Sequence, residues 1–194
     1  MAEDTASASL YEQFRASYGR DGPDYSILKK ADGAEREALI EALIQAVNTN
    51  KDGWAALALG TLKAAAAVPA LTVALEAAAP SEGAYLARAL WDIEGRIEHV
   101  VYIAEAIFEP GNDPFDRMSL IGLLTRVREP PAFDALERAL YDRDYLVRRC
   151  AASIFSHNSA RRTADRTIDN NLSNYDEQKI RRFAEKLRSK IDPR

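Results

Sequence analysis

A repeated pattern of 31 to 33 residues is the feature that most constrains the fold of this 194-residue chain. It is counted at one slot, which holds Gly53, Ala84, Arg117 and Arg148 in turn. The last two copies close the pattern Asp-x-x-x-Arg, from Asp113 and from Asp144. Small and apolar residues at helical spacing follow each slot. Such a period predicts stacked helical units, each of which needs its neighbours to bury its apolar face.

A second landmark repeats in the other half of each unit. The residues Leu71, Ala74 and Leu75 correspond to Leu136, Ala139 and Leu140, with Ile103, Ala106 and Ile107 between them. In the first of these copies, Leu71, Ala74, Leu75 and Ala78 fall on one face of a helix, and Pro69 suits a first helical turn. Two landmarks with one period predict pairs of helices, about ten helices in all, and no strand.

Both halves of the pattern resemble HEAT-like repeats of the short type found in phycobilin lyases. The first half is matched by Asp144, Val147, Arg148, Ala151 and Ala152, and the second by Ala67 to Leu71 with Ala74 and Leu75. The resemblance covers roughly residues 53 to 155 and departs at Gly53, at Ala84 and at Trp91, where glycine is usual. It implies an all-α fold, a right-handed α-solenoid of helical hairpins. Such repeats serve mostly as scaffolds, so the resemblance alone does not assign a function.

The flanking segments are expected to cap the array, so that residues 1–194 form one domain. Within 1–50, Leu39, Leu43 and Val47 mark an amphipathic helix from about 34 to 48. Within 156–194, a final amphipathic helix is expected to be capped by Ser173 or Asn174, with Asp176 and Glu177 in its first turn. The polar segment 157–172 is predicted as a further helix between them.

The chain carries few groups suited to catalysis. Its two histidines, His99 and His157, have no metal-binding spacing and are interpreted as surface or helix-end residues. Its one cysteine, Cys150, is interpreted as a small core residue, although Arg148 and Arg149 could lower its pKa. The sequence has no phosphate-binding loop and no nucleophile motif. We expect no catalytic residue, no metal and no cofactor.

Charge and termini indicate the compartment and the partner. The N-terminus is acidic, without the basic and apolar regions of a secretory signal, and no apolar run is long enough to span a membrane. A single cysteine fits a reducing environment, so a cytoplasmic protein without membrane contact is expected. The net charge of −4 is uneven: residues 51–110 hold four basic and eight acidic residues, and residues 149–194 hold 11 basic and six.

The acidic centre favours protein binding without catalysis. We expect the second helices of the pairs to line a concave face that binds a basic protein, as an adaptor or a stoichiometric inhibitor such as a bacterial toxin-immunity protein. The candidate contacts on this face are Trp91, Asp92, Glu94, Glu98, Tyr102 and Glu105. Structural roles in the repeat turns are assigned to Asp113, Arg117, Asp144 and Arg148.

The alternative is an enzyme, either a chromophore-lyase-like accessory or a DNA alkylation glycosylase. HEAT-like glycosylases use aromatic residues and an aspartate, and the adjacent Trp91 and Asp92 resemble that arrangement, whereas the tryptophans equally suit seams between helices. The acidic charge of this segment opposes phosphate binding. The basic last helix, which carries Lys179, Arg181, Arg182, Lys186, Arg188 and Lys190, is a weaker candidate for nucleic acid or an acidic protein.

Overall fold

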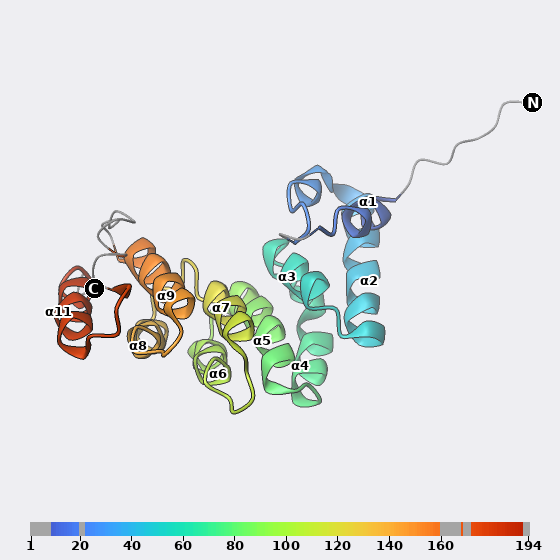
Figure 1. Ribbon diagram of the computed structural model, residues 1–194. Coiled ribbons are helices and arrows are strands. Elements are labelled where there is room, and N and C mark those ends of the chain that lie inside the picture. Colours follow the sequence, from blue (N-terminus) through green and yellow to red (C-terminus); the bar gives the residue numbers. More distant parts are fainter. Residues whose placement is uncertain (1–8, 20–21, 160–167, 169–171, 192–194) are drawn as a thin grey trace, which may run out of the picture.

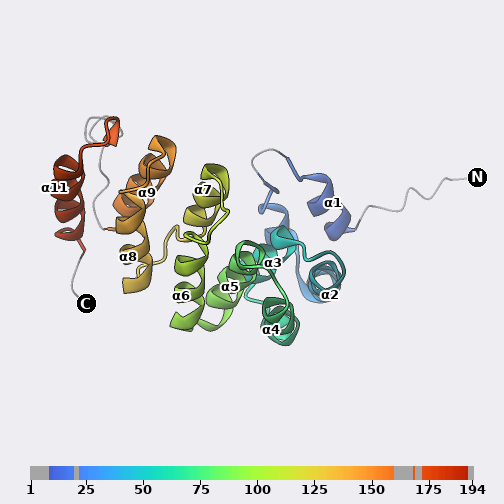
Figure 2. The same cartoon turned by 60° about the horizontal axis from the view of Figure 1, so that its bottom comes forward.

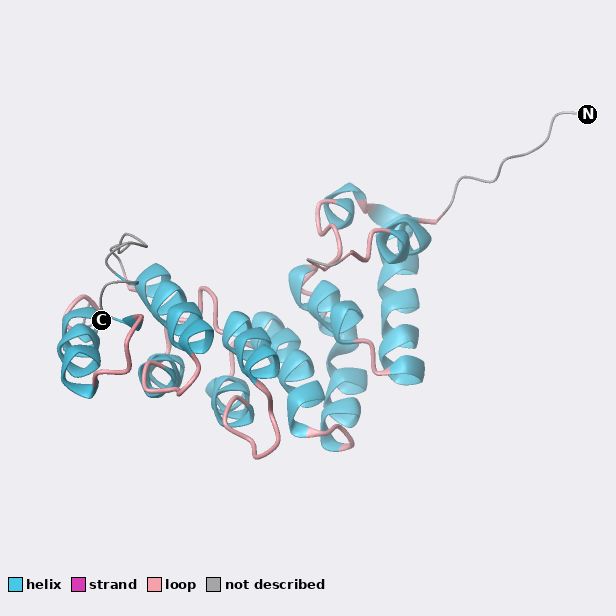
Figure 3. Ribbon diagram, in the orientation of Figure 1, coloured by secondary structure: helices cyan, strands magenta, loops and turns pink. Residues whose placement is uncertain are grey.

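A computed structural model describes residues 9–19, 22–159, 168 and 172–191 of the chain. The fold is all-α, and the described residues contain no strand beyond one isolated bridge between Gly19 and Gly22 (Figure 3). The α-helices are α1 (Leu10–Ala16), α2 (Gly33–Asn50), α3 (Gly53–Thr61), α4 (Val68–Glu76), α5 (Pro80–Glu94), α6 (Ile97–Ala106), α7 (Pro114–Leu123), α8 (Pro130–Ala139), α9 (Tyr145–Asn158) and α11 (Glu177–Arg188). Short 3-10 turns at Ile27–Lys30 (η1) and Ala65–Ala67 (η2) precede α2 and α4.

The helices form a curved row of hairpins (Figures 1 and 2). The first helices α3, α5, α7 and α9 follow the hollow side of the row and are called the inner row here. The second helices α4, α6 and α8 follow the opposite side and are called the outer row. Neighbours within the inner row pack directly on one another, α3 on α5, α5 on α7 and α7 on α9. The expectation that second helices line the concave side is therefore wrong for this chain.

Small residues explain the direction of the curve. On α3, a Cβ added at Gly60 would stand 2.9 Å from the Cα of Ala89 on α5, so the two backbones are in close approach. Buried alanines line the same helices, including Ala56, Ala87 and Ala151. Helices that meet through such residues approach more closely than helices that meet through leucine, so the row bends towards its inner side.

The repeat period in the structure is measured from the first residue of each inner-row helix to the first residue of the next. Inner-row helices begin at residues 53, 80, 114 and 145, and α11 begins at 177, which is 27, 34, 31 and 32 residues from one start to the next. The equivalence of Gly53 with Arg117 is therefore out of register, because Gly53 opens α3 whereas Arg117 is the fourth residue of α7. The regular part of the pattern starts at α5 and reaches α11.

Aspartates begin most of these helices. The side chains of Asp52, Asp113, Asp144 and Asp176 each accept two backbone N–H groups at the start of the helix that follows. This pattern satisfies the unpaired donors of a helix N-terminus and places negative charge at its positive end. Asp176 caps α11, so the expected caps Ser173 and Asn174 are wrong by two or three residues.

The core is continuous through α5. Ala84 and Ala87 of α5 belong to the cluster that runs from α6 to α11, while Leu86 and Leu90 belong to the cluster formed with α1 to α4. At the N-terminal end, Phe14 is fully buried and its ring meets Tyr18 and Tyr25 edge-on. The helix predicted over 157–172 lies mostly outside the described residues.

Candidate functional site

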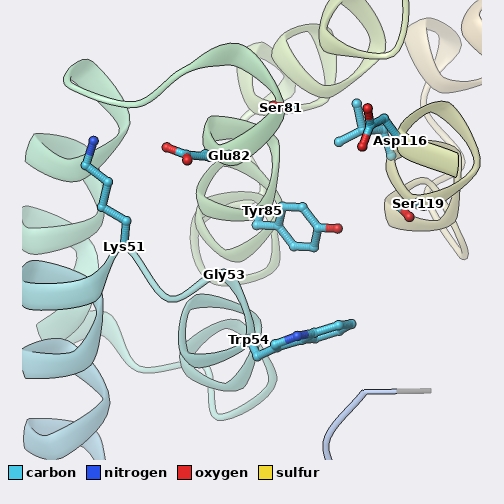
Figure 4. A pocket seen from close by; sticks show the side chains of 9 residues that line it. Lys51, Gly53, Trp54, Ser81, Glu82, Tyr85, Asp116 and Ser119 are labelled. Atoms are coloured by element: carbon cyan, nitrogen blue, oxygen red, sulfur yellow. The ribbon is translucent and has the colours of Figure 1, made fainter. Parts of the chain in front are cut away.

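The hollow side of the row carries two adjoining cavities over α5. The first, of about 290 Å³, is lined from α3 by Gly53 and Trp54, from α5 by Ser81, Glu82 and Tyr85, from α7 by Asp116, Ser119 and Leu120, and by Lys51 (Figure 4). The second, of about 510 Å³, extends along α3, α5 and α7 towards the end of α9. Trp54 lines both cavities, so they form one surface with the tryptophan at its centre.

Two glycines position the aromatic rings of this surface. A Cβ at Gly22 would stand 3.1 Å from the Trp54 ring, and a Cβ at Gly53 would stand 3.0 Å from the Tyr85 ring. Gly22 has a φ of 94°, a backbone conformation that glycine adopts without strain. Trp54 and Tyr85 meet edge to face with ring centroids 6.1 Å apart and planes at 70°. The rings are held in place by backbone, while 38% of Trp54 remains exposed.

Carboxylates give the first cavity a negative charge. Glu82 makes no ion pair or hydrogen bond through its carboxylate within the described part of the chain. Asp116 accepts the backbone N–H of Asp113 at 3.1 Å through Oδ2, which completes the capping box of α7. Burial raises the pKa of the Tyr85 hydroxyl, and the Asp116 carboxylate adds to that rise. With Lys51 as the cation of the lining, this cavity has a net charge of −1.

The polar lining of the second cavity includes an ion pair between Arg88 and Asp92. The Arg88 Nε lies 2.9 Å from Asp92 Oδ2, and the same guanidinium donates to the carbonyls of Leu123 and Thr125 at the end of α7. Arg126 and His157 also line the cavity. Tyr25 also lines this cavity, and its hydroxyl is buried without a hydrogen bond to the described residues. Asp92 is thus neutralised by Arg88.

Large exposed apolar side chains recur along the inner row. Trp54, Phe115 and Leu146 each stand two residues after a capping aspartate, at the start of α3, α7 and α9. Their exposed fractions are 38%, 72% and 48%. In α5 the corresponding residue is Ser81, which lines the first cavity. One position of the repeat therefore places three large apolar groups at the same end of the inner-row helices.

The six residues predicted to form an acidic binding face do not gather in one place. Asp92 lines the second cavity, Trp91 packs half-buried against the core, and Tyr102 places its hydroxyl against Gly83 of α5. At the turn between α5 and α6, Glu94 bonds to His99 at 3.0 Å and Glu98 pairs with Arg96. Glu105 lies on the outer row, in a shallow cavity between α6 and α8.

The residues assigned to the repeat turns contact neighbouring turns. Arg117 donates to the carbonyl of Asn112 at 2.6 Å and pairs with Asp142 in the next inner-row turn. Arg148 is 2% exposed, and among the described residues it donates only to carbonyls, those of Asp142, Arg143 and Leu172. The carboxylates of Asp113 and Asp144 do not meet these arginines, because they cap α7 and α9.

Cys150 and the histidines occupy ordinary packing positions. Burial raises the pKa of the Cys150 thiol, so the suggested lowering of that pKa by Arg148 and Arg149 is wrong. His99 is 9% exposed, hence buried rather than superficial. His157 lies in the last turn of α9. The described residues contain no group of three or more side chains able to hold a metal ion, and none of their helices has the length and apolarity needed to cross a bilayer.

Sequence reasoning missed the groups that line the first cavity. Neither Glu82 nor Tyr85 stands out in the sequence, and the tryptophans equally suit seams between helices. The available signal was the recurrence of a large apolar residue two positions after Asp52, Asp113 and Asp144.

Comparison with known proteins adds no relative: no family model matches the chain, and no curated protein matches it.

Proposed function

We propose that the chain is a HEAT-like α-solenoid that binds another protein through its inner row, without catalysis. The repeat period, the capping aspartates and the stacked hairpins support the interpretation of the fold as HEAT-like. The observation that carries the binding proposal is the exposed row Trp54, Phe115 and Leu146 beside a negatively charged cavity. Aromatic residues in contact with a partner contribute a large share of binding energy, since they bury much area at low entropic cost.

The charge of the first cavity favours a basic partner. Glu82 has no partner of its own in the described residues, so a cation from another protein would meet an unneutralised carboxylate. We therefore propose that the acidic binding face lies on α5 and α7 of the inner row, rather than at Glu98 and Glu105. A stoichiometric inhibitor of a basic protein, such as an immunity protein against a bacterial toxin, is the form of this function that we propose first.

A photo-crosslinking experiment tests the proposal directly. Benzoylphenylalanine would replace Phe115 of the inner row in one chain and Val73 of α4 in another, expressed in the native host. The two positions are matched in exposure, at 72% and 68%. We expect a discrete crosslinked protein of basic charge from position 115 and none from position 73. Crosslinks of equal yield from both positions, or none from the inner row, would contradict the proposal.

The DNA glycosylase remains the second candidate, on one observation. The second cavity brings Asp92 together with the aromatic side chains of Tyr25 and Trp54 and with two arginines, Arg88 and Arg126. Against it, a catalytic carboxylate must be available to the substrate, whereas Arg88 holds both oxygens of Asp92 at 2.9 and 3.3 Å. Release of alkylated purine from methylated duplex DNA, abolished by Asp92→Asn, would favour this candidate over the first.

A further inference from the structure

The first cavity has the form of an aromatic corner. Trp54 supplies one wall and Tyr85 the other, with their planes at 70°, and Figure 4 shows both rings directed to the side where α7 presents Asp116 and Ser119. The backbone packs closely against both rings, at Gly22 beside Trp54 and at Gly53 beside Tyr85, and a side chain at either glycine would collide with its ring. The corner is therefore formed before any ligand arrives, which lowers the entropic cost of binding.

The electrostatics of this corner select a cation. The face of an indole or phenol ring attracts positive charge, and Trp attracts it most strongly. Two carboxylates, Glu82 from α5 and Asp116 from α7, line the same cavity on different helices. Lys51 also lines it, but makes no ion pair within the described residues, so it neutralises neither carboxylate by direct contact.

The shape distinguishes between the two common cations of proteins. A guanidinium is planar and stacks on an aromatic face while its edge donates several hydrogen bonds, whereas an ammonium is a compact and strongly hydrated charge. A flat ring beside acceptors from Asp116 and the hydroxyl of Ser119 matches a stacked group with donors at its edge, while Glu82, which Figure 4 shows directed to the other side of Tyr85, adds negative charge at longer range. The cavity is also open to solvent along Trp54, so a side chain can enter from outside.

We propose that the cavity between α3, α5 and α7 is a recognition pocket for an arginine side chain of the partner protein. The proposal rests on the proposed function and makes it specific. The guanidinium stacks on Trp54, its edge faces Asp116, and Glu82 supplies the unpaired negative charge. Phe115, at the start of α7, would then contact the partner beside that arginine.

The pocket can be tested on the whole chain with a small probe. The chain has two tryptophans, and their indole N–H signals in a nitrogen–proton correlation spectrum are assigned by Trp91→Phe. N-acetyl-arginine methylamide is titrated at constant ionic strength, with the citrulline analogue as a neutral probe of the same shape. We expect saturable movement of the Trp54 signal with a Kd of roughly 1–10 mM, and binding of citrulline at least about tenfold weaker. The Trp91 signal should stay in place.

Matched variants separate this site from general charge attraction. Glu82→Gln removes one charge from the pocket and should weaken arginine binding by about two- to fivefold, since the pair is partly screened. Glu105→Gln removes the same charge from the outer row and should leave the Kd unchanged. Equal binding of arginine and citrulline, no saturable movement of Trp54, or equal effects of the two variants would overturn the proposal. Crosslinking from Phe115 could still succeed in that case, so failure of the pocket and failure of the proposed function are distinguishable.

Discussion

The Arg117 guanidinium pairs with the Asp142 carboxylate across two successive inner-row turns. Its Nε lies 2.8 Å from Oδ2, in an alignment too poor for a hydrogen bond, and its Nη2 donates to Oδ1 at 3.2 Å. Asp142 also accepts the backbone N–H of Asp144 at 2.8 Å, directly before α9. One repeat further on, Arg148 reaches the carbonyl of Leu172. Each arginine thus links its own turn to the next, which fixes the spacing between hairpins.

Replacement of Arg148 should severely destabilise the fold. Arg148→Met leaves the carbonyls of Asp142, Arg143 and Leu172 without the donors that satisfy them in a buried place. Each buried polar group that loses its partner costs about 1–3 kcal/mol, so we expect a loss of more than about 3 kcal/mol in the free energy of unfolding. Urea denaturation measures it. The exposed neighbour gives the control: Arg149→Met should cost less than about 1 kcal/mol. Equal losses would refute the turn-linking role.

Asn158 is expected to be nearly as sensitive. Its amide donates to the carbonyls of Leu124 and Val127 at 2.8 Å and accepts the N–H of Arg126 at 2.7 Å, which holds the turn between α7 and α8. Arg126 has a φ of 65°, an unfavourable conformation for a residue with a side chain. Asn158→Ala should therefore lower the free energy of unfolding by about 2–4 kcal/mol. His157→Ala, one residue away, should lower it by less than about 1 kcal/mol in the same thermal or urea melts.

The helices were readable from the sequence because their signals are local. Apolar spacing predicts the helix that contains Leu39, Leu43 and Val47. The aspartates before α7 and α9 mark the starts of those two helices, through hydrogen bonds to backbone groups within three residues. The direction of the curve was not readable, since it depends on how closely two helices approach, as at Gly60 and Ala89. That distance belongs to a pair of helices, and periodicity within one helix does not contain it.

The candidate site depends on contacts that cross the sequence. The Trp54 ring packs against Gly22, 32 residues earlier in the chain. The lining of the first cavity includes Glu82 of α5 and Asp116 of α7. In the sequence, Arg148 stands four residues after Asp144, whereas its acceptor Leu172 lies 24 residues further on. An arginine satisfied by carbonyls has no sequence signature, because every residue supplies a carbonyl.

Cys150 should react slowly with alkylating reagents. Burial raises the pKa of its thiol, so the reactive thiolate is scarcer than in a free cysteine at the same pH. We expect alkylation by iodoacetamide at pH 8 at least about tenfold slower than for a cysteine peptide, and a normal rate once the chain is unfolded in guanidinium. The alkylation rate of Cys150 should continue to increase at pH values above the ordinary pKa of a thiol. A native rate equal to that of the peptide would contradict the slow reaction expected from burial, and a faster rate would support a thiol activated by Arg148 and Arg149.

Two glycines, Gly60 near the end of α3 and Gly122 near the end of α7, should respond to alanine with opposite signs. A Cβ at Gly60 would stand 2.9 Å from the Cα of Ala89, which is backbone and cannot move away alone. Gly122 is exposed on α7, and a Cβ there has nothing within 4 Å. Because alanine favours a helix over glycine by about 1 kcal/mol, Gly122→Ala should raise the free energy of unfolding by up to that amount.

Gly60→Ala gains the same helix propensity but must separate α3 from α5. Overpacking of a close contact costs about 1–3 kcal/mol, so the net effect should be a lower stability by up to about 2 kcal/mol. Urea titration of both variants beside the parent chain measures the difference. The two should also differ at the cavity over α5: Gly60→Ala shifts the Trp54 indole signal by moving α3, whereas Gly122→Ala leaves it near its original position. Stabilisation by both substitutions would mean that α3 and α5 do not meet through Gly60, and that close packing does not set the curve of the row.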